Sequence, residues 1–119
     1  MEPRSYSDPV AWQKAIDLAE ATYRATSGWP SAESFGLTSQ TRRAAASIPA
    51  NIAEGKGRTG SREFLHHLSI AHGSLWELET HLHLARRLDY LAENVLDALL
   101  SQTAEVSRLI RGLIRSLQT

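Results

Sequence analysis

The stretch that decides the fold of this chain reads Ser47-Ile48-Pro49-Ala50-Asn51-Ile52-Ala53-Glu54-Gly55-Lys56-Gly57. Its proline stands inside a run that otherwise has a helical composition. Proline inside a helix forfeits a backbone hydrogen bond and clashes with the carbonyl four residues back, that of Ala45, at a cost of about 3 kcal/mol. We therefore expect a bent helix with Pro49 in its interior and with Ile48 and Ile52, one turn apart, on its inner face.

Helical periodicity on both sides of this stretch predicts four helices. They cover about residues 8–26, 38–54, 61–88 and 94–116. No long alternating run of Val, Ile and Thr favours a strand. Because long helices joined by short links favour antiparallel neighbours, the predicted fold is all-α, an antiparallel up-and-down four-helix bundle, and residues 1–119 form one domain.

Short polar residues and glycines indicate where the helices begin and end. Gly55 and Gly57 are expected to close the second helix. The first three helices start with residues that can cap a helix or fit its first turn: Asp8 before Pro9, Thr38 and Ser61.

Apolar side chains at helical spacing predict the core. In the first helix Trp12, Ile16, Ala19 and Tyr23 recur every three or four residues and should share the buried face. The third and fourth helices carry sustained stripes with coiled-coil-like spacing. Trp12 and Trp76 are expected in the core or in an interface. The predicted core consists of Ile16, Ile48, Ile52, Leu68, Leu75, Leu78, Leu82, Leu99, Val106 and Ile110.

The composition excludes several classes of protein. With no cysteine there is no disulfide, no thiolate nucleophile and no zinc site built on cysteine, and nothing indicates an oxidising compartment. The first six residues lack a basic start followed by an apolar segment, and no run of about 18 apolar residues occurs. The sequence therefore predicts a cytoplasmic protein with neither a signal peptide nor a membrane span.

The formal net charge is zero, but the charges are unevenly spread. Residues 38–62 hold five basic side chains against Glu54 alone, whereas residues 1–37 and 63–119 each carry a charge of −2. Eleven of the thirteen basic residues are arginines, which suit bidentate contacts to phosphate or carboxylate. The candidate nucleic-acid-binding residues are Arg42, Arg43, Lys56, Arg58 and Arg62.

These five residues are expected to form two patches. A helix over residues 38–54 separates Arg42 and Arg43 from the other three by on the order of 20 Å. Glycines at positions 55, 57 and 60 expose backbone N–H groups near a helix start, which favours an anion site at the second patch. The competing interpretation is a set of solvated or salt-bridged arginines.

The stretch from Leu37 to Gly55 resembles the second-helix motif of the 23S rRNA intervening-sequence proteins, a four-helix-bundle family. The motif residues within it are Ile48, Pro49, Asn51, Ile52, Glu54 and Gly55. Further matches follow in order at Phe64-Leu65, Ser69-Ile70-Ala71, Ser74-Leu75-Trp76-Glu77-Leu78-Glu79-Thr80 and Leu84-Ala85-Arg86-Arg87-Leu88-Asp89-Tyr90-Leu91, and Trp12-Gln13-Lys14-Ala15 matches the first helix. Asp89 stands where the family often has glycine, so the third helix is expected to be capped differently.

The resemblance implies a small bacterial bundle whose biochemical role is generally unassigned. A related branch, the accessory proteins of diversity-generating retroelements, forms ring-shaped pentamers and binds nucleic acid through a basic surface. The resemblance therefore implies a homo-oligomer, a pentamer in that branch, with RNA or DNA as a candidate partner. Members of that branch are strongly basic, whereas this chain is neutral.

Carboxylates and histidines raise the question of a metal or acid–base site. Glu63-Phe64-Leu65-His66 is the only Glu-x-x-His, whereas di-iron bundles need two. Glu63–His67, Glu77–His81 and Glu79–His83 are four residues apart, which suits surface pairs on a helix. The histidines His66, His67, His72, His81 and His83 lack the His-Glu-x-x-His order, and no Gly-x-Ser-x-Gly occurs. We predict no catalytic residue, no metal and no cofactor.

Together these features predict a non-enzymatic, self-associating scaffold with nucleic acid as its ligand. The alternative is a protein–protein adaptor whose arginine patches meet an acidic partner.

Overall fold

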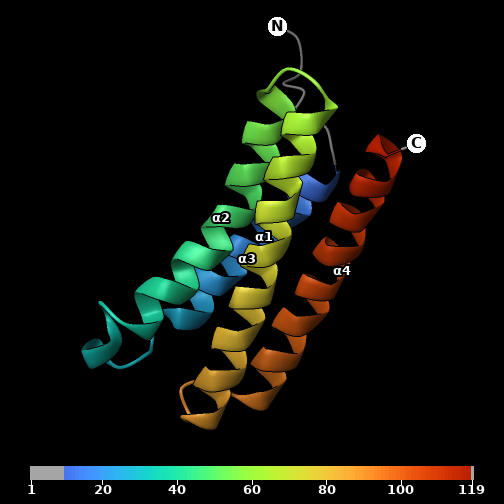
Figure 1. Cartoon of the computed structure of the whole chain (residues 1–119). Coiled ribbons are helices and arrows are strands. Elements are labelled where there is room, and N and C mark those ends of the chain that lie inside the picture. The colour runs from blue at the N-terminus through green and yellow to red at the C-terminus, as the bar shows by residue number, and fades with distance from the viewer. Residues whose placement is uncertain (1–9, 119) are drawn as a thin grey trace, which may run out of the picture.

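The computed structural model describes residues 10–118. It contains the helices α1 (Val10–Thr26), α2 (Leu37–Gly57), α3 (Ser61–Arg87) and α4 (Glu93–Leu117), with a short 3₁₀ helix, η1 (Ser31–Glu33), between α1 and α2. Each α-helix packs against its two neighbours in the cycle α1–α2–α3–α4, and α2 and α3 make the most extensive contact (Figure 1). The predicted up-and-down four-helix bundle is confirmed.

The starts of two helices differ from the prediction. α2 begins at Leu37, one residue before the expected cap Thr38, and the Leu37 N–H donates to the Glu33 carboxylate at 3.0 Å. α3 begins at Ser61, whose side chain makes no capping hydrogen bond, because Gly60 occupies the N-cap position with a φ of 90°. Both predicted hydroxyl caps are therefore wrong. The predicted start at Asp8 and Pro9 lies outside the described residues.

The core is one cluster that all four helices share. Every predicted core residue is buried except Ile16, which is 40% exposed. The buried face of α1 instead carries Ala11, Ala15, Leu18, Thr22 and Thr26, one position round the helix from the predicted stripe. Small side chains there let α1 approach its neighbours closely, and the hydroxyls of the two threonines bond to carbonyls of the preceding turn. The spacing of apolar residues in the sequence did not show which of these two faces of α1 is buried.

The stretch around Pro49 forms the middle of α2 as predicted. Ile48 and Ile52 are fully buried, and Pro49 is buried beside them. Asn51 turns toward α3 and donates from Nδ2 to the carbonyl and the hydroxyl oxygen of Ser47, at 2.9 and 3.0 Å. The Ser47 hydroxyl lies 2.9 Å from that of Ser74 on α3, so polar side chains accompany the apolar contact between the two helices.

Gly55 lies inside α2 rather than at its end, because the helix continues to Gly57. A Cβ atom at position 55 would come within 2.7 Å of His67 Cβ and 2.9 Å of Phe64 Cδ1. Glycine therefore allows the close approach of α2 and α3 just before the turn that joins them.

The end of α3 also differs from the prediction. Asp89 has a φ of 64°, the left-handed conformation that glycine adopts at helix ends. The Tyr90 N–H donates to the Ala85 carbonyl and the Asp89 N–H to the Arg86 carbonyl, which is the Schellman arrangement. The aspartate thus replaces glycine within the same cap, and the expected difference in capping does not occur.

Candidate functional site

The first predicted pair of arginines lies near the start of α2, and one of the two is already engaged. The Arg42 guanidinium donates to Thr26 Oγ1 at 2.7 Å and to the Tyr23 carbonyl at 3.2 Å. It also lies 4.8 Å from the centroid of the Tyr23 ring, within cation–π range. The Arg42 side chain therefore binds the last turn of α1. Arg43 is exposed and has no ion pair among residues 10–118.

The other three predicted residues lie at the opposite end of α2, around the turn into α3. Arg58 donates to Glu54 Oε2 at 2.6 Å, and both side chains are about half exposed. This hydrogen bond and the opposite charge lower the pKa of Glu54 and raise that of Arg58. Lys56 Nζ lies 5.6 Å from the centroid of the Phe64 ring, and Arg62 is exposed. The five predicted residues therefore fall into two groups at opposite ends of the bundle.

A third set of arginines, which the segment charges did not bring out, lies on α4. Arg108, Arg111 and Arg115 are spaced by three and four residues, so they share one exposed face near the end of the helix. None of them has an ion pair in the part of the chain that the structure describes. The sequence does contain a sign of this basic row, because no acidic residue follows Glu105. The net charge of residues 63–119 taken together is negative, since the acidic residues up to Glu105 outweigh the arginines that follow, so the segment charges did not reveal it.

Antiparallel packing brings this row to the end of the bundle that holds the α2–α3 turn (Figure 1). We call residues 50–66 and 108–117 the basic end. Its six basic side chains are Lys56, Arg58, Arg62, Arg108, Arg111 and Arg115, and its two carboxylates are Glu54 and Glu63, which gives a net charge of +4. The other described residues carry a net charge of −3. A chain with zero net charge is thus strongly polarised along its length.

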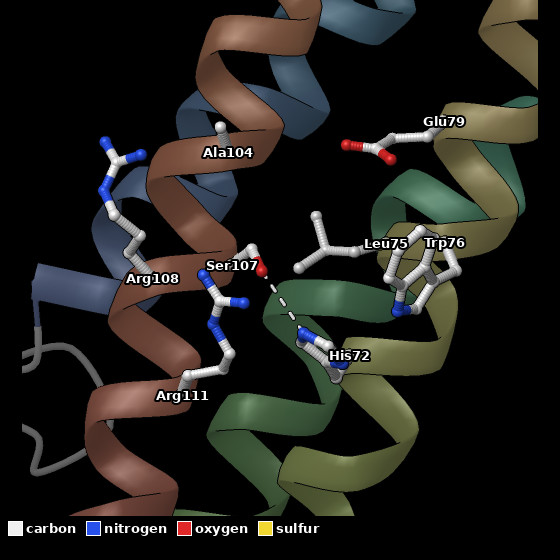
Figure 2. A pocket seen from close by; sticks show the side chains of 8 residues that line it. All are labelled: His72, Leu75, Trp76, Glu79, Ala104, Ser107, Arg108 and Arg111. Atoms are coloured by element: carbon white, nitrogen blue, oxygen red, sulfur yellow. Dashed lines mark hydrogen bonds between the residues drawn. The ribbon is translucent and has the colours of Figure 1, made fainter.

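A groove between α3 and α4 opens beside the basic end (Figure 2). Its volume is about 250 Å³, and it is lined by His72, Leu75, Trp76, Glu79, Ala104, Ser107, Arg108 and Arg111. Leu75 belongs to the hydrophobic core and forms the floor, and His72 Nε2 lies 3.2 Å from Ser107 Oγ across the groove. Figure 2 shows Trp76 on the α3 side and both arginines on the α4 side.

Trp76 is the most exposed of the large apolar residues that line this groove. Trp76 is 64% exposed, so of its two expected places the core is wrong and an interface stays a prediction, whereas Trp12 is half-buried and packs against the core. The His72 ring meets the Trp76 ring edge to face, with centroids 6.3 Å apart and planes at 84°. This contact supports one side of the indole and leaves most of it open to solvent.

The carboxylates and histidines of α3 serve contacts between helices. Thr103 Oγ1 donates to Glu79 Oε2 at 2.9 Å, and His67 Nδ1 lies 3.0 Å from Asn51 Oδ1. Of the three predicted Glu–His pairs, Glu77–His81 comes within 4.0 Å in the described residues. No three His, Asp or Glu side chains between residues 10 and 118 are placed to hold a metal ion.

Comparison with known proteins identifies the family. The family model described as the 23S rRNA-intervening sequence protein matches residues 7–112, which include almost the whole bundle. The chain belongs to this 23S rRNA-intervening sequence protein family. The matched residues include those lining the α3–α4 groove, whereas Arg115 lies beyond them.

The structure of this family member also resembles a solved one. A protein of unknown function from the S23 ribosomal protein family of Bacteroides thetaiotaomicron aligns with a TM-score of 0.75 over 96% of this chain and 99% of its own. The two sequences are 23% identical, so the likeness shows the shared fold. None of the curated proteins matches the chain. In the described residues of this family member, no helix combines the length and apolar character needed to span a membrane.

Proposed function

We propose that this member of the 23S rRNA-intervening sequence protein family is a non-enzymatic scaffold that binds nucleic acid through its basic end. The supporting observation is the net charge of +4 gathered at one end of a neutral chain. Phosphate backbones bind where guanidinium and ammonium groups cluster, irrespective of the charge elsewhere.

The neutral net charge does not oppose this proposal. The bundle is 43 Å long, whereas the Debye length at physiological ionic strength is about 8 Å. A polyanion at the basic end is therefore largely screened from the acidic residues near the other end. Arg108, Arg111 and Arg115 also lack neutralising partners within residues 10–118, so their charge is available to a ligand.

A salt titration with structured RNA and duplex DNA tests the proposal. Replacing Arg108, Arg111 and Arg115 together with glutamine should weaken binding and reduce the slope of log K against log salt by roughly 2 to 3, since each phosphate contact contributes about 0.7 to 0.9. The matched control replaces Arg24, Arg43 and Arg87, which removes the same charge outside the basic end. Absence of binding at low salt, or equal loss in both triple variants, would contradict the proposal.

We further propose that the scaffold self-associates. Eight large apolar residues are exposed in the described part of the single chain, among them Phe35 at 98%, Ile70 at 40%, and Leu84 and Leu88 at 45% each. Ile70 and Leu84, about four turns apart, share one face of α3, and the C-cap residue Leu88 follows one turn later on the same side. Such apolar surface supports association of identical subunits.

Light scattering at micromolar concentration tests self-association. The mass should be at least twice 13.2 kDa, and replacing Leu84 and Leu88 with serine should lower it. A mass of 13.2 kDa for the unchanged protein would contradict this part of the proposal.

A protein–protein adaptor is the second candidate. Guanidinium groups bind carboxylates in the same bidentate way as phosphates, so the basic end also fits an acidic polypeptide. Competition separates the two functions. If polyglutamate displaces RNA at equal charge concentration, the adaptor is favoured, and if it does not, nucleic acid is the better ligand.

A further inference from the structure

We propose that the groove between α3 and α4 binds a single strand of nucleic acid, with one unpaired base stacked on Trp76 and the neighbouring phosphates on Arg108 and Arg111. This inference rests on the proposed nucleic-acid function and adds the site and the strandedness of the ligand. Proteins that bind single strands combine a cationic track with aromatic side chains on which bases stack.

The position of Trp76 supports a stacking role. Its ring lines the groove, 64% of the side chain is exposed, and the His72 ring buttresses it edge to face. Trp76 lies about 120° round the helix from Ile70 and Leu88 and about 80° from Leu84. In the single chain, its exposed indole is open to a ligand in the groove.

The size of the groove favours a single base. Its volume of about 250 Å³ lies just below the roughly 300–1,000 Å³ of typical small-molecule pockets. Leu75 gives the floor an apolar surface, and His72 and Ser107 place polar atoms across it. A base inserted here must be free of its complementary strand, since paired bases in a duplex are stacked and covered.

The charged residues of the groove indicate the path of the bound strand's phosphate backbone. Arg108 and Arg111 are three residues apart on α4, so their Cβ atoms lie about 5–6 Å apart and both side chains can reach phosphates of one strand. Glu79 occupies the other end of the groove, where its carboxylate accepts the Thr103 hydroxyl hydrogen bond. The carboxylate repels phosphate from that end, so the strand continues along α4 toward Arg115 and the basic end.

The test compares a short oligonucleotide, free and annealed to its complement, by fluorescence anisotropy at several salt concentrations. The free strand should bind more tightly to the unchanged protein than the duplex. Trp76→Ala should weaken binding of the free strand by about 5- to 150-fold, the range that loss of one stacked base produces, and should leave duplex binding unchanged. Trp76→Phe should retain most of the affinity.

Matched variants identify the groove. Arg108→Gln with Arg111→Gln should lower the salt slope for the single strand by about 1.4. Ile16→Ala, an exposed apolar change on α1, and Arg43→Gln should leave single-strand affinity within about twofold. Circular dichroism should show every variant folded.

The outcomes separate the two proposals. If the unchanged protein binds nucleic acid but Trp76→Ala has no effect, or if the duplex binds as tightly as the free strand, the groove inference is overturned and binding at the basic end stands. If neither form of the oligonucleotide binds at low salt, both proposals fail.

Discussion

His67 on α3 faces Asn51 on α2, with His67 Nδ1 3.0 Å from Asn51 Oδ1. Asn51 Nδ2 donates to the Ser47 carbonyl, which fixes the amide so that its oxygen points to the imidazole. Because an amide oxygen can only accept, His67 Nδ1 must carry the proton. These hydrogen bonds and the Ser47–Ser74 contact form a polar ladder between α2 and α3. Each side chain of the ladder has a hydrogen-bond partner when the two helices pack in the observed register.

We expect Asn51→Ala to destabilise the protein by about 1–3 kcal/mol, because it removes hydrogen bonds to two partners and leaves a half-buried imidazole N–H unpaired. Urea unfolding monitored by circular dichroism measures this change. Asn94→Ala, an exposed substitution in the first turn of α4, should stay within about 0.5 kcal/mol of the unchanged protein. Equal effects of the two substitutions would show that the ladder contributes nothing to stability.

The close approach at Gly55 predicts opposite effects for two glycine substitutions. Gly55→Ala should cost about 1–3 kcal/mol, since the new methyl group overlaps His67 Cβ and Phe64. Gly73→Ala in the middle of α3 should stabilise by about 0.5–1 kcal/mol, because nothing lies within 4 Å of the added Cβ and alanine is the better helix former. Thermal unfolding of both variants tests the pair, and a stabilising Gly55→Ala would contradict the packing described.

The left-handed conformation of Asp89 predicts a stabilising substitution. Asp89→Gly should raise the free energy of unfolding by about 1 kcal/mol, because glycine adopts a φ of 64° without a Cβ penalty. Asp89→Asn removes the charge but keeps a residue that tolerates this conformation, so it should change stability little. A destabilising Asp89→Gly would mean that the exposed Arg86–Asp89 contact at 4.0 Å outweighs the backbone strain.

The hydrogen bond from the Tyr90 hydroxyl to Glu33 predicts a dependence on alkaline pH. This 3.0 Å bond, followed by burial and the charge of Glu33, raises the pKa of Tyr90 above its ordinary value of 10.0. The folded state therefore favours the protonated phenol, and its contribution to stability is fully present below pH 10 and lost as the pH rises through the folded-state pKa. Stability above pH 10 should fall more steeply in the unchanged protein than in Tyr90→Phe, as measured by urea unfolding. Tyr23→Phe should keep the steep fall.

The corrected face of α1 predicts a contrast between two isoleucines. Ile52→Asp should unfold the protein, because it buries an unpaired carboxylate at a position with no solvent exposure. Ile16→Asp should cost less than about 1 kcal/mol, since Ile16 is 40% exposed. Circular dichroism and unfolding curves distinguish the two. A folded Ile52→Asp variant, or an unfolded Ile16→Asp variant, would contradict the arrangement of the core.

Sequence periodicity predicted the helices and most of the core, but less of the candidate site. The buried sides of α3 and α4 were predictable because long branched side chains recur on one side of each helix, and that of α2 because Ile48 and Ile52 lie one turn apart among small residues. In α1 the buried side consists of alanines, one leucine and threonines, and larger apolar residues lie one position away, so spacing favoured the wrong face. The hydroxyl caps failed because Glu33 and Gly60 occupy those roles.

The sequence by itself determined the helices, the family and the inner face of α2, since proline, glycine and periodic apolar residues act on the chain within a few turns of themselves. Only the tertiary structure decided that Arg62 near the start of α3 and Arg111 near the end of α4 lie toward one end of the bundle, and that Trp76 lies across a groove from Arg111, which has no ion pair among residues 10–118. The physical reason is that antiparallel packing joins helix ends far apart along the chain. Charge that cancels in the sequence is thereby distributed unevenly along a bundle 43 Å long, about five times the screening length.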